Sequence, residues 1–447
     1  MIARVFLALS AFLFILAIFK GTSIDFKSLA GVPKVTQPKQ QQSSGSNSDQ
    51  EREMELGNIV SSSKVSNKQQ SVIMNDPHIN KKWGLAKTNT LDAWQVSTGS
   101  REIIVAIVDT GIDVDHPDIK NNLWRNPGES GRDKNGRDKA SNGIDDDGNG
   151  YIDDVHGWNF VHGNNYLKDN HGHGTHIAGI VGAEGGNNIG VTGVAPHVSL
   201  MVLKYFDPKS PGNNLVNTIK AFNYAVEMNA HIINYSGGGS DFSQMEYQAV
   251  QKAEQKGILF VAAAGNEHSN SDFNKYYPAD YDLDNIISVT ALNPNLEVLN
   301  TSNYGVHTVD IAAPGENIYS TVPGNGIGKM TGTSQATAFV SGVAALLMAH
   351  NRDFDAKAVK KYILRTGDNL DWLKSKTGTS KKLNVYRALT MLDQGVGASG
   401  VVAANTNEQD SEYFQAPSPS APAQKKGTSL GGFGQSLMRA IQSKENQ

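Results

Sequence analysis

The sequence predicts an α/β fold with three layers, α/β/α, around a mostly parallel central sheet. Its strand-like segments are continuous apolar runs and not alternating ones, which is typical of parallel strands covered on both faces. Segments with helical spacing of apolar residues separate these runs along the chain. Because function in such folds gathers at the carboxyl ends of the strands, polar residues that follow a strand are the first candidates for a site.

The elements that support this fold class can be placed in order. The strand-like segments cover residues 103–108, 198–203, 231–234, 258–264 and 286–289. The helix-like segments cover residues 176–182, 217–229, 244–256 and 334–350. The last of these is apolar almost all round, so we expect it to be a buried helix.

The predicted globular body, residues 72–392, lies between segments of different composition. Residues 1–30 contain Arg4 and an uncharged run from 5 to 19, which predicts a signal peptide or a signal-anchor. The run is shorter than the roughly 20 residues of a stable membrane span. Residues 31–71 predict a low-complexity linker or short pro-segment, and residues 393–447 a low-complexity tail. We therefore expect export, with a secreted, periplasmic or membrane-tethered product.

The overall composition excludes several classes of protein. The 447 residues contain no cysteine, which excludes a disulfide scaffold, a thiolate metal site and a cysteine nucleophile. A net charge of -4 argues against a nucleic-acid-binding protein. We expect a monomer that contacts a membrane only through an N-terminal anchor.

Three short polar blocks carry the chemistry. Asp109 stands in Val-Asp-Thr-Gly-Ile-Asp, directly after a strand-like segment, where an aspartate can also cap a turn. His-Gly-His-Gly-Thr-His begins at His171, and its three histidines also suggest a metal site, although the His-Glu-x-x-His pattern is absent. Ser334 opens the apolar helix, where a serine can also serve as an N-cap.

Together these blocks resemble the subtilisin-like serine peptidases, the subtilases, over roughly residues 75–390. VDTGID, HGTHIAG and GTSQATAFVSG each match a signature of that family. The resemblance implies a subtilisin-like fold and an Asp109-His173-Ser334 triad. His173 would take the proton of the Ser334 hydroxyl, and Asp109 would hold the imidazole in its tautomer. Asn266, in Ala-Gly-Asn-Glu, would stabilise the oxyanion together with the backbone N–H of Ser334.

The resemblance also implies how substrate binds. One short segment would pair with an extended peptide as an edge strand, and a second would form a wall of the pocket for the P1 side chain. These residues are Ser236, Gly237, Gly238, Ala264 and Gly265. Tyr276 matches the base of the pocket, and its bulk predicts a preference for small or medium P1 side chains.

An acidic segment from Asn142 to Asp154 predicts a calcium loop. Its carboxylates would repel one another without a cation, since no Lys or Arg lies among them. Five positions follow the spacing of a calcium loop: Asp145, Asp147, Asn149, Tyr151 and Asp153. His156 stands where an EF-hand has Glu, so the segment resembles the calcium-binding inserts of some subtilases. A solvated acidic loop is the alternative.

A second calcium site rests on the resemblance alone. Its implied ligands are Asp76, Asp118, Asn187 and the backbone carbonyls of Ile189 and Val191. Such a site would tie the N-terminal segment to the body and couple calcium binding to stability.

We therefore expect an exported serine endopeptidase that hydrolyses protein or peptide substrates through an acyl-enzyme. One alternative is a surface-anchored subtilase-fold processing or binding module with a narrow substrate or little turnover. Another is metal-dependent hydrolysis at the three-histidine segment. Only about 50 residues separate the apolar run from the body, fewer than in the prodomain of many subtilases, so the sequence leaves the route of maturation open.

Overall fold

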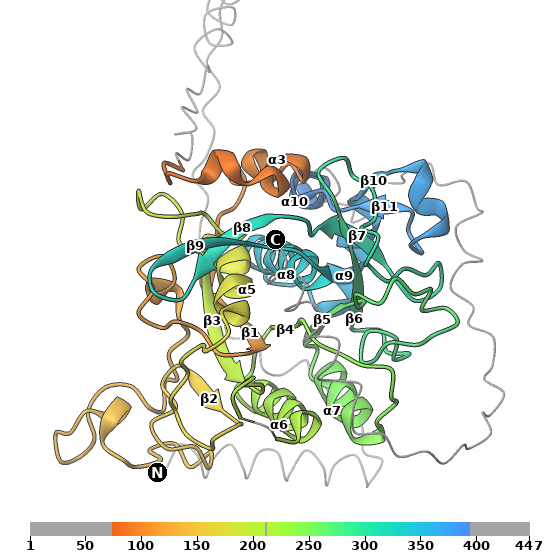
Figure 1. Ribbon diagram of the computed structural model, residues 1–447. Coiled ribbons are helices and arrows are strands. Elements are labelled where there is room, and N and C mark those ends of the chain that lie inside the picture. Colours follow the sequence, from red (N-terminus) through yellow and green to blue (C-terminus); the bar gives the residue numbers. More distant parts are fainter. Residues whose placement is uncertain (1–73, 211, 394–447) are drawn as a thin grey trace, which may run out of the picture. The chain divides into compact units, whose positions relative to one another are not determined.

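A nine-stranded sheet runs through the part of the chain that this computed structural model describes, which is residues 74–393 without residue 211 (Figure 1). Its strand order is β10-β11-β7-β6-β5-β4-β1-β3-β2, and only the β10–β11 pair is antiparallel. The strands are β1 (Gly99–Asp109), β2 (Gly157–Asn159), β3 (His197–Lys204), β4 (Ile232–Tyr235), β5 (Leu259–Ala263), β6 (Ile286–Leu292), β7 (Ile311–Pro314), β10 (Asp368–Asn369) and β11 (Lys381–Lys382). The predicted mostly parallel sheet is confirmed.

A separate two-stranded hairpin lies beside helix α5 (Figure 1). It pairs β8 (Ile318–Val322) with β9 (Gly326–Met330) in antiparallel register.

Helices cover both faces of the sheet. The helices that the structure describes are α3 (Trp83–Lys87), α4 (Thr90–Ala93), α5 (His173–Gly182), α6 (Asn214–Glu227), α7 (Gln244–Gln255), α8 (Thr333–His350), α9 (Ala356–Thr366) and α10 (Val385–Asp393). Short 3-10 turns are η2 (Ile79–Lys81), η3 (Lys120–Asn122), η4 (Lys139–Ser141) and η5 (Asp371–Ser375). Helices α6 and α7 lie on one face, and α5, α8 and α9 lie on the other (Figure 1). This is the predicted α/β/α arrangement.

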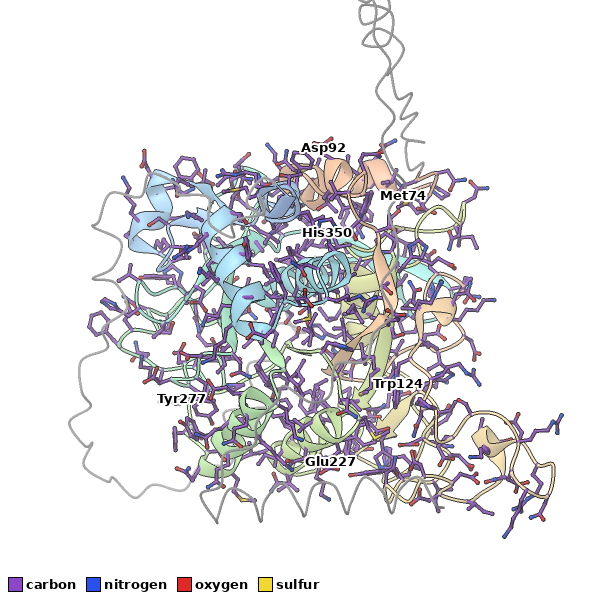
Figure 2. All side chains as sticks on the ribbon, turned by 180° about the vertical axis from the view of Figure 1, so that it is seen from behind. Met74, Asp92, Trp124, Glu227, Tyr277 and His350 are labelled. Atoms are coloured by element: carbon purple, nitrogen blue, oxygen red, sulfur yellow. The ribbon has the colours of Figure 1, made fainter. Side chains whose placement is uncertain are left out.

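Two apolar cores form because each strand is buried on both faces. In β1, Val105 and Ile107 pack into the core beneath α5 and α8, whereas Ala106 and Val108 pack toward α6 and α7. Burial of successive apolar side chains on opposite faces explains the continuous apolar run in the sequence. Figure 2 shows the side chains of the described residues in a view from behind.

Helix α8 is the central element of the larger core. Every residue from 333 to 348 is buried, as the apolar sequence predicts. The helix packs against β1, β4, β5, β6 and β7. Its first turn therefore lies close to the carboxyl ends of these strands, where the predicted site residues also lie.

The predicted leader (1–30), the linker (31–71) and nearly all of the tail (393–447) lie outside the described residues. Among the helices that the structure describes, none combines the length and hydropathy needed to cross a bilayer.

Candidate active site

Asp109 and His173 form a buried hydrogen-bonded pair at the carboxyl edge of the sheet. Asp109 is the last residue of β1, and His173 is the first residue of α5. His173 Nδ1 donates to Asp109 Oδ1 at 2.8 Å and approaches Oδ2 at 3.0 Å. The backbone N–H of Thr110 also donates to Oδ1, at 2.8 Å. A proton on Nδ1 leaves Nε2 of the neutral ring as an acceptor, which is the form a general base requires.

Ser334 lies in the first turn of α8 and contacts the end of β4. Its Oγ donates to the backbone carbonyl of Ser236 at 3.1 Å, and Ser236 Oγ donates to the carbonyl of Ser334 at 3.3 Å. Ser334 is 6% exposed and His173 is 8% exposed, so both are largely shielded from solvent. The positive end of the α8 dipole favours negative charge at this point.

Asn266 follows β5 and is oriented by the start of α8. Its Oδ1 accepts hydrogen bonds from the backbone N–H of Thr333 at 3.0 Å and from Thr333 Oγ1 at 3.3 Å. With the oxygen engaged by Thr333, the amide –NH2 group is the part of the side chain that can donate to a ligand. The structure thus brings Asn266 to the residue that immediately precedes Ser334.

Asn303 holds the loop after β5 in place, and no motif in the sequence indicated it. Its Nδ2 donates to the carbonyl of Ala264 at 2.9 Å and to Glu267 Oε2 at 2.8 Å. Its Oδ1 accepts from the N–H groups of Glu267 and Ser269, at 3.0 and 2.9 Å. A single buried amide therefore fixes both sides of Asn266.

The ring of Tyr276 lies between the two predicted substrate-binding segments. A Cβ at Gly238 would lie 2.3 Å from Cε1 of Tyr276, and a Cβ at Gly265 would lie 3.0 Å from Cδ2. Tyr276 itself is 8% exposed. Glycine at both positions lets the backbone approach the ring, and at Gly265 it also permits a φ of +102°.

The hydroxyl groups of Tyr205 and Tyr235 lie close to Gly237, the middle residue of the predicted substrate-binding segment 236–238. A Cβ at Gly237 would lie 2.5 Å from the hydroxyl oxygen of Tyr205 and 3.0 Å from that of Tyr235. At the next residue along the chain, the backbone N–H and C=O groups of Gly239 and Tyr277 form two hydrogen bonds, of 2.9 and 2.7 Å. Bulky rings therefore fill the space that side chains at these glycines would need.

The neighbouring histidines have other partners. His176 is fully buried, its Nε2 lies 2.9 Å from the carbonyl of Ile318, and burial lowers its pKa to about 3. The ring centre of His171 lies 6.2 Å from that of His173. Among the described residues, the carboxylate and imidazole groups that could share a metal do not include these histidines.

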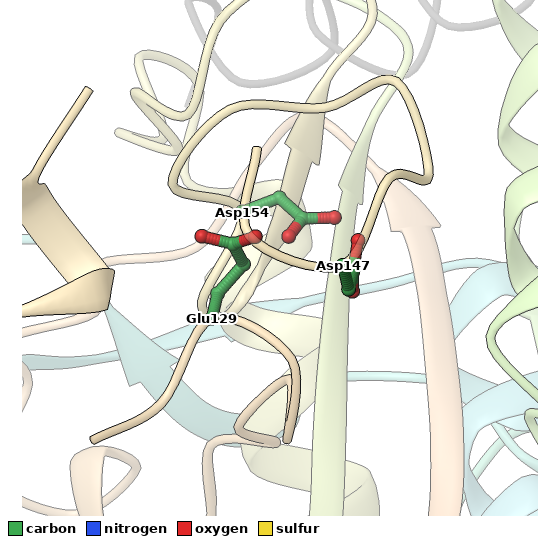
Figure 3. A group of neighbouring side chains, drawn as sticks. All are labelled: Glu129, Asp147 and Asp154. Atoms are coloured by element: carbon green, nitrogen blue, oxygen red, sulfur yellow. The ribbon is translucent and has the colours of Figure 1, made fainter. Parts of the chain in front are cut away.

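Three carboxylates, Glu129, Asp147 and Asp154, come together in a group of their own (Figure 3). One oxygen of each lies within 4.8 Å of the others. Burial raises the pKa of Glu129, and the negative charges of Asp154 and Asp147 raise it further. Glu129 Oε1 accepts from the N–H of Asp146, whereas the buried Oε2 has no hydrogen-bond partner among the described residues. An orphaned buried oxygen beside two carboxylates fits a hard divalent cation such as calcium.

Amide side chains complete the surroundings of this carboxylate group. Asn126 Nδ2 donates to Asp154 Oδ1 at 2.7 Å and to Asp147 Oδ2 at 2.9 Å. Asn149 Nδ2 donates to Asp154 Oδ2 at 2.9 Å. A Cβ at Gly128 would lie 2.3 Å from the Asp147 carboxylate, so glycine is needed there for the close approach.

The predicted loop ligands only partly coincide with this group. Asp147 belongs to it, and Asn149 donates to its member Asp154. Asp145 instead accepts the backbone N–H groups of residues 148, 149 and 150, and Asp153 accepts that of Gly143. The ring of Tyr151 packs against Trp158, Phe160 and Tyr224. The contiguous spacing predicted Asp153 and missed Glu129 and Asp154.

The residues of the second predicted calcium site also come together, but with their oxygens engaged. Asp76 accepts from the N–H groups of Gly186 and Asn187 and from the hydroxyl of Thr192. Asp118 accepts from Asn187 Nδ2 at 3.0 Å and from the N–H of Val191 at 2.7 Å. The residues Ile189 and Val191, whose carbonyls were predicted as ligands, lie in the same loop.

A buried lysine adds positive charge beside this second site. Lys82 is 4% exposed, and its Nζ donates to the carbonyl of Thr192 at 2.6 Å. Burial lowers the pKa of Lys82 to about 7, although Asp118 and Asp76 oppose this change. The fit to a calcium ion is therefore weaker here than at Glu129, Asp147 and Asp154.

Comparisons with known proteins agree with the geometry. The model of the subtilase family matches residues 100–398. Thermitase of Thermoactinomyces vulgaris is 33% identical over 319 residues, which cover 70% of this chain and 98% of thermitase. The thermophilic serine proteinase of Bacillus sp. (strain AK1) is 33% identical over 311 residues, covering 69% of this chain and 67% of that protein.

Other relatives are much longer than the matched region. Subtilisin-like protease 2 of Plasmodium falciparum is 33% identical over 327 residues, covering 72% of this chain and 22% of that protein. The solved structure of a lanthipeptide protease superposes with a TM-score of 0.57 at 22% identity, over 72% of this chain and all of that chain, and so supports the fold alone. Because the family match spans more than half of the sequence, this chain belongs to the subtilase family.

Proposed function

We propose that this chain is an exported serine endopeptidase with Asp109, His173 and Ser334 as its catalytic triad. The observation that carries the proposal is the buried Asp109–His173 pair, with a 2.8 Å hydrogen bond, at the same sheet edge as Ser334 and Asn266. A charged partner on Nδ1 stabilises the imidazolium that forms when the ring takes a proton. Family membership supports the same assignment.

The proposed reaction has two halves. For attack, the Ser334 hydroxyl turns from the Ser236 carbonyl to His173 Nε2, which removes its proton as Oγ bonds to the substrate carbonyl carbon. The oxyanion accepts from the Asn266 amide and the Ser334 N–H. The imidazolium then protonates the leaving amine, and the C–N bond breaks to give an acyl-enzyme. In the second half, His173 takes a proton from water, the hydroxide displaces Ser334, and the proton returns to Oγ.

We propose that Ser236, Gly237 and Gly238 pair with the backbone of an extended substrate, which gives binding with little dependence on side chains. We further propose that Tyr276 restricts P1 to small or medium side chains. The support is its ring, which contacts the backbone on both sides of the predicted pocket.

We propose that calcium binds at Glu129, Asp147 and Asp154 and stabilises the fold. A bound cation would supply positive charge that neutralises the carboxylates and would satisfy Glu129 Oε2. The chain's amides at Asn126 and Asn149 would orient two of the carboxylates. We keep Asp76, Asp118 and Asn187 as a second proposed site with weaker support.

Export, a monomeric state and the assignment of residues 1–30, 31–71 and 393–447 stay proposals from the sequence. Thermitase and the Bacillus relative share the matched body, which supports a catalytic unit within residues 72–392.

The proposal is tested by the hydrolysis of casein by the full chain in buffer with calcium. We expect hydrolysis by the wild type, none by Ser334→Ala, and unchanged hydrolysis by Ser375→Ala, which removes an exposed hydroxyl in η5. Equal hydrolysis by Ser334→Ala and the wild type would contradict the proposed nucleophile. Loss of activity with a zinc chelator, but not with Ser334→Ala, would favour a metal hydrolase.

A further inference from the structure

We propose that Asp169 is a positioning residue that holds His173 against Asp109. This inference rests on the proposed function. The Asp169 carboxylate is 3% exposed and accepts five hydrogen bonds from the residues around the triad. None of the sequence motifs indicated it.

The first role of Asp169 is to accept hydrogen bonds at the N-terminal end of α5. The N-cap of this helix is Gly172, which has a φ of +93° and no side chain to accept the free N–H groups of the first turn. Asp169 Oδ1 accepts the N–H groups of His171 and Gly172 at 2.9 and 2.7 Å. Its Oδ2 accepts the N–H and the hydroxyl of Thr175 at 2.9 and 2.7 Å. One carboxylate therefore fixes both the loop before His173 and the helical turn after it.

The second role is to tie this turn to the strand that carries Asp109. Thr110 Oγ1 donates to Asp169 Oδ1 at 2.9 Å and accepts the N–H of Gly174 at 2.9 Å. The backbone N–H of Thr110 donates to Asp109 Oδ1. Thr110 thus connects the Asp169 carboxylate, the turn that contains His173 and the Asp109 carboxylate.

Because α5 begins in close contact with the end of β1, a small shift of the helix would displace His173 relative to Asp109. A Cβ at Gly174 would lie 2.1 Å from the carbonyl oxygen of Gly111 and 3.1 Å from Cβ of Asp109. Helix α5 therefore begins in direct contact with the end of β1, and the hydrogen bonds of Asp169 set the angle of that contact. A displacement of about 1 Å between reacting groups can cost about 100-fold in rate.

The contacts of Asp169 predict a specific kinetic effect. Each of them is made to Thr110, to the turn before α5 or to Thr175, and not to the segments proposed to bind substrate. Its loss should therefore slow the chemical step and leave substrate binding nearly unchanged.

The test compares Asp169→Asn with the wild type in the full chain. Asn has the same shape as Asp, but it replaces one acceptor oxygen with an –NH2 group. This group cannot accept the hydrogen bonds that the surrounding N–H and O–H groups donate to Asp169. We expect kcat to fall about ten- to a hundredfold per active site, with KM changed less than about twofold. Active sites are counted by labelling with a fluorophosphonate, so that unfolded molecules do not enter kcat.

Two further variants separate positioning from stability. Asp368→Asn removes a carboxylate in β10, the outermost strand of the sheet on the side away from β1, that accepts from Lys382, Asn384 and Arg387, and should lower the melting temperature without changing kcat. Thr110→Val should lower kcat, and the double variant Asp169→Asn/Thr110→Val should lose less than the product of the two single losses, since both act through one network.

A wild-type kcat per labelled site in Asp169→Asn, or an equal fall in Asp368→Asn, would overturn the positioning role. Inactivity of the wild type would instead contradict the proposed function, and with it this inference.

Discussion

The carboxylate of Asp109, at the end of β1, accepts the Nδ1–H of His173, at the start of α5, through a 2.8 Å hydrogen bond. The two residues are 64 positions apart in the chain, and the fold joins them because the parallel sheet brings strand ends and helix starts to one edge. Replacing Asp109 with Asn would present an amide where the ring needs an acceptor. We expect kcat to fall by about 10⁴ with little change in KM, the size of effect known for such a change in another serine protease family. A fall below tenfold per labelled site would contradict the pairing.

Removal of the Asn266 amide should slow the reaction without weakening substrate binding. In Asn266→Ala, the oxyanion loses its side-chain donor, and kcat should fall by about 10²- to 10³-fold, a magnitude known from subtilisin and so not independent of this family. KM should stay within about twofold, because the ground-state carbonyl gains little from the donor. A rise in KM at constant kcat would assign Asn266 to substrate binding.

Replacing Tyr276 with a small residue should let the enzyme accept larger P1 side chains. Tyr276→Ala removes the ring that contacts Gly238 and Gly265, and a P1 side chain such as Phe gains the vacated space. We expect kcat/KM for P1 Phe over P1 Ala to rise at least tenfold, the scale of a few buried methylenes. The measurement is cleavage of a peptide library by the wild type, Tyr276→Ala and the control Tyr386→Ala, which changes an exposed residue of α10. Wild-type cleavage best after Phe or Tyr would contradict the proposed restriction.

The response to a calcium chelator should show whether calcium binds at Glu129, Asp147 and Asp154 or at the ligands that the sequence spacing predicted. We expect EDTA to lower the melting temperature and speed autolysis of the wild type, because a ligand of the folded state stabilises it by mass action. Glu129→Gln should remove most of this EDTA effect. Asp145→Asn should keep it, since Asp145 accepts backbone N–H groups of its own loop and lies outside the group.

The control for this prediction is the wild type with magnesium in place of calcium, which should protect less because magnesium demands a tighter octahedral site. An EDTA effect that Asp145→Asn abolishes and Glu129→Gln keeps would restore the sequence-based ligand set. An unchanged melting temperature and autolysis rate in EDTA would exclude both calcium proposals.

Burial of Glu246 should make stability fall as the pH rises. Glu246 is 3% exposed, and burial raises its pKa from 4.5 to about 7, although a hydrogen bond from Tyr281 opposes the change. The folded state then binds the proton more tightly than the unfolded state. The contribution to the free energy of unfolding is fully present below pH 4.5 and is lost as the pH rises through about 7.

Glu246→Gln keeps an acceptor for Tyr281 and removes the titration. Between pH 4.5 and pH 8, we expect the wild type to lose on the order of 2–3 kcal/mol more than the variant in urea unfolding. Both are measured in a Ser334→Ala background to prevent autolysis. Parallel curves for the two proteins would show that Glu246 does not titrate in this range.

The sequence predicted those parts of the fold that depend on long apolar runs. The buried strand at residues 103–108 and the helix at 334–350 correspond to β1 and α8 within a few residues at each end, because burial on all sides leaves an unbroken apolar pattern. Strand β9 was not predicted, since Gly-Ile-Gly-Lys-Met has neither a continuous nor an alternating apolar pattern. It forms by pairing in a hairpin with β8, which in turn contacts α5.

The site was predicted only as far as local motifs reach. Asp109, His173, Ser334 and Asn266 each stand in a recognisable block, whereas Asp169 and Asn303 are indicated only by hydrogen bonds that form in the folded chain. The carboxylate group of Glu129, Asp147 and Asp154 shows the same limit. A contiguous loop spacing cannot include Glu129, which lies 17 residues before the residue to whose N–H it bonds.

The most direct test of the account is the site at which a fluorophosphonate probe reacts with the full wild-type chain. The probe phosphonylates a serine hydroxyl, with loss of fluoride, only where a neighbouring base removes the hydroxyl proton. We predict one adduct, which peptide mass spectrometry assigns to Ser334, and no adduct in Ser334→Ala or after denaturation. An adduct on another serine, or no adduct on a folded protein that hydrolyses casein, would contradict the central claim.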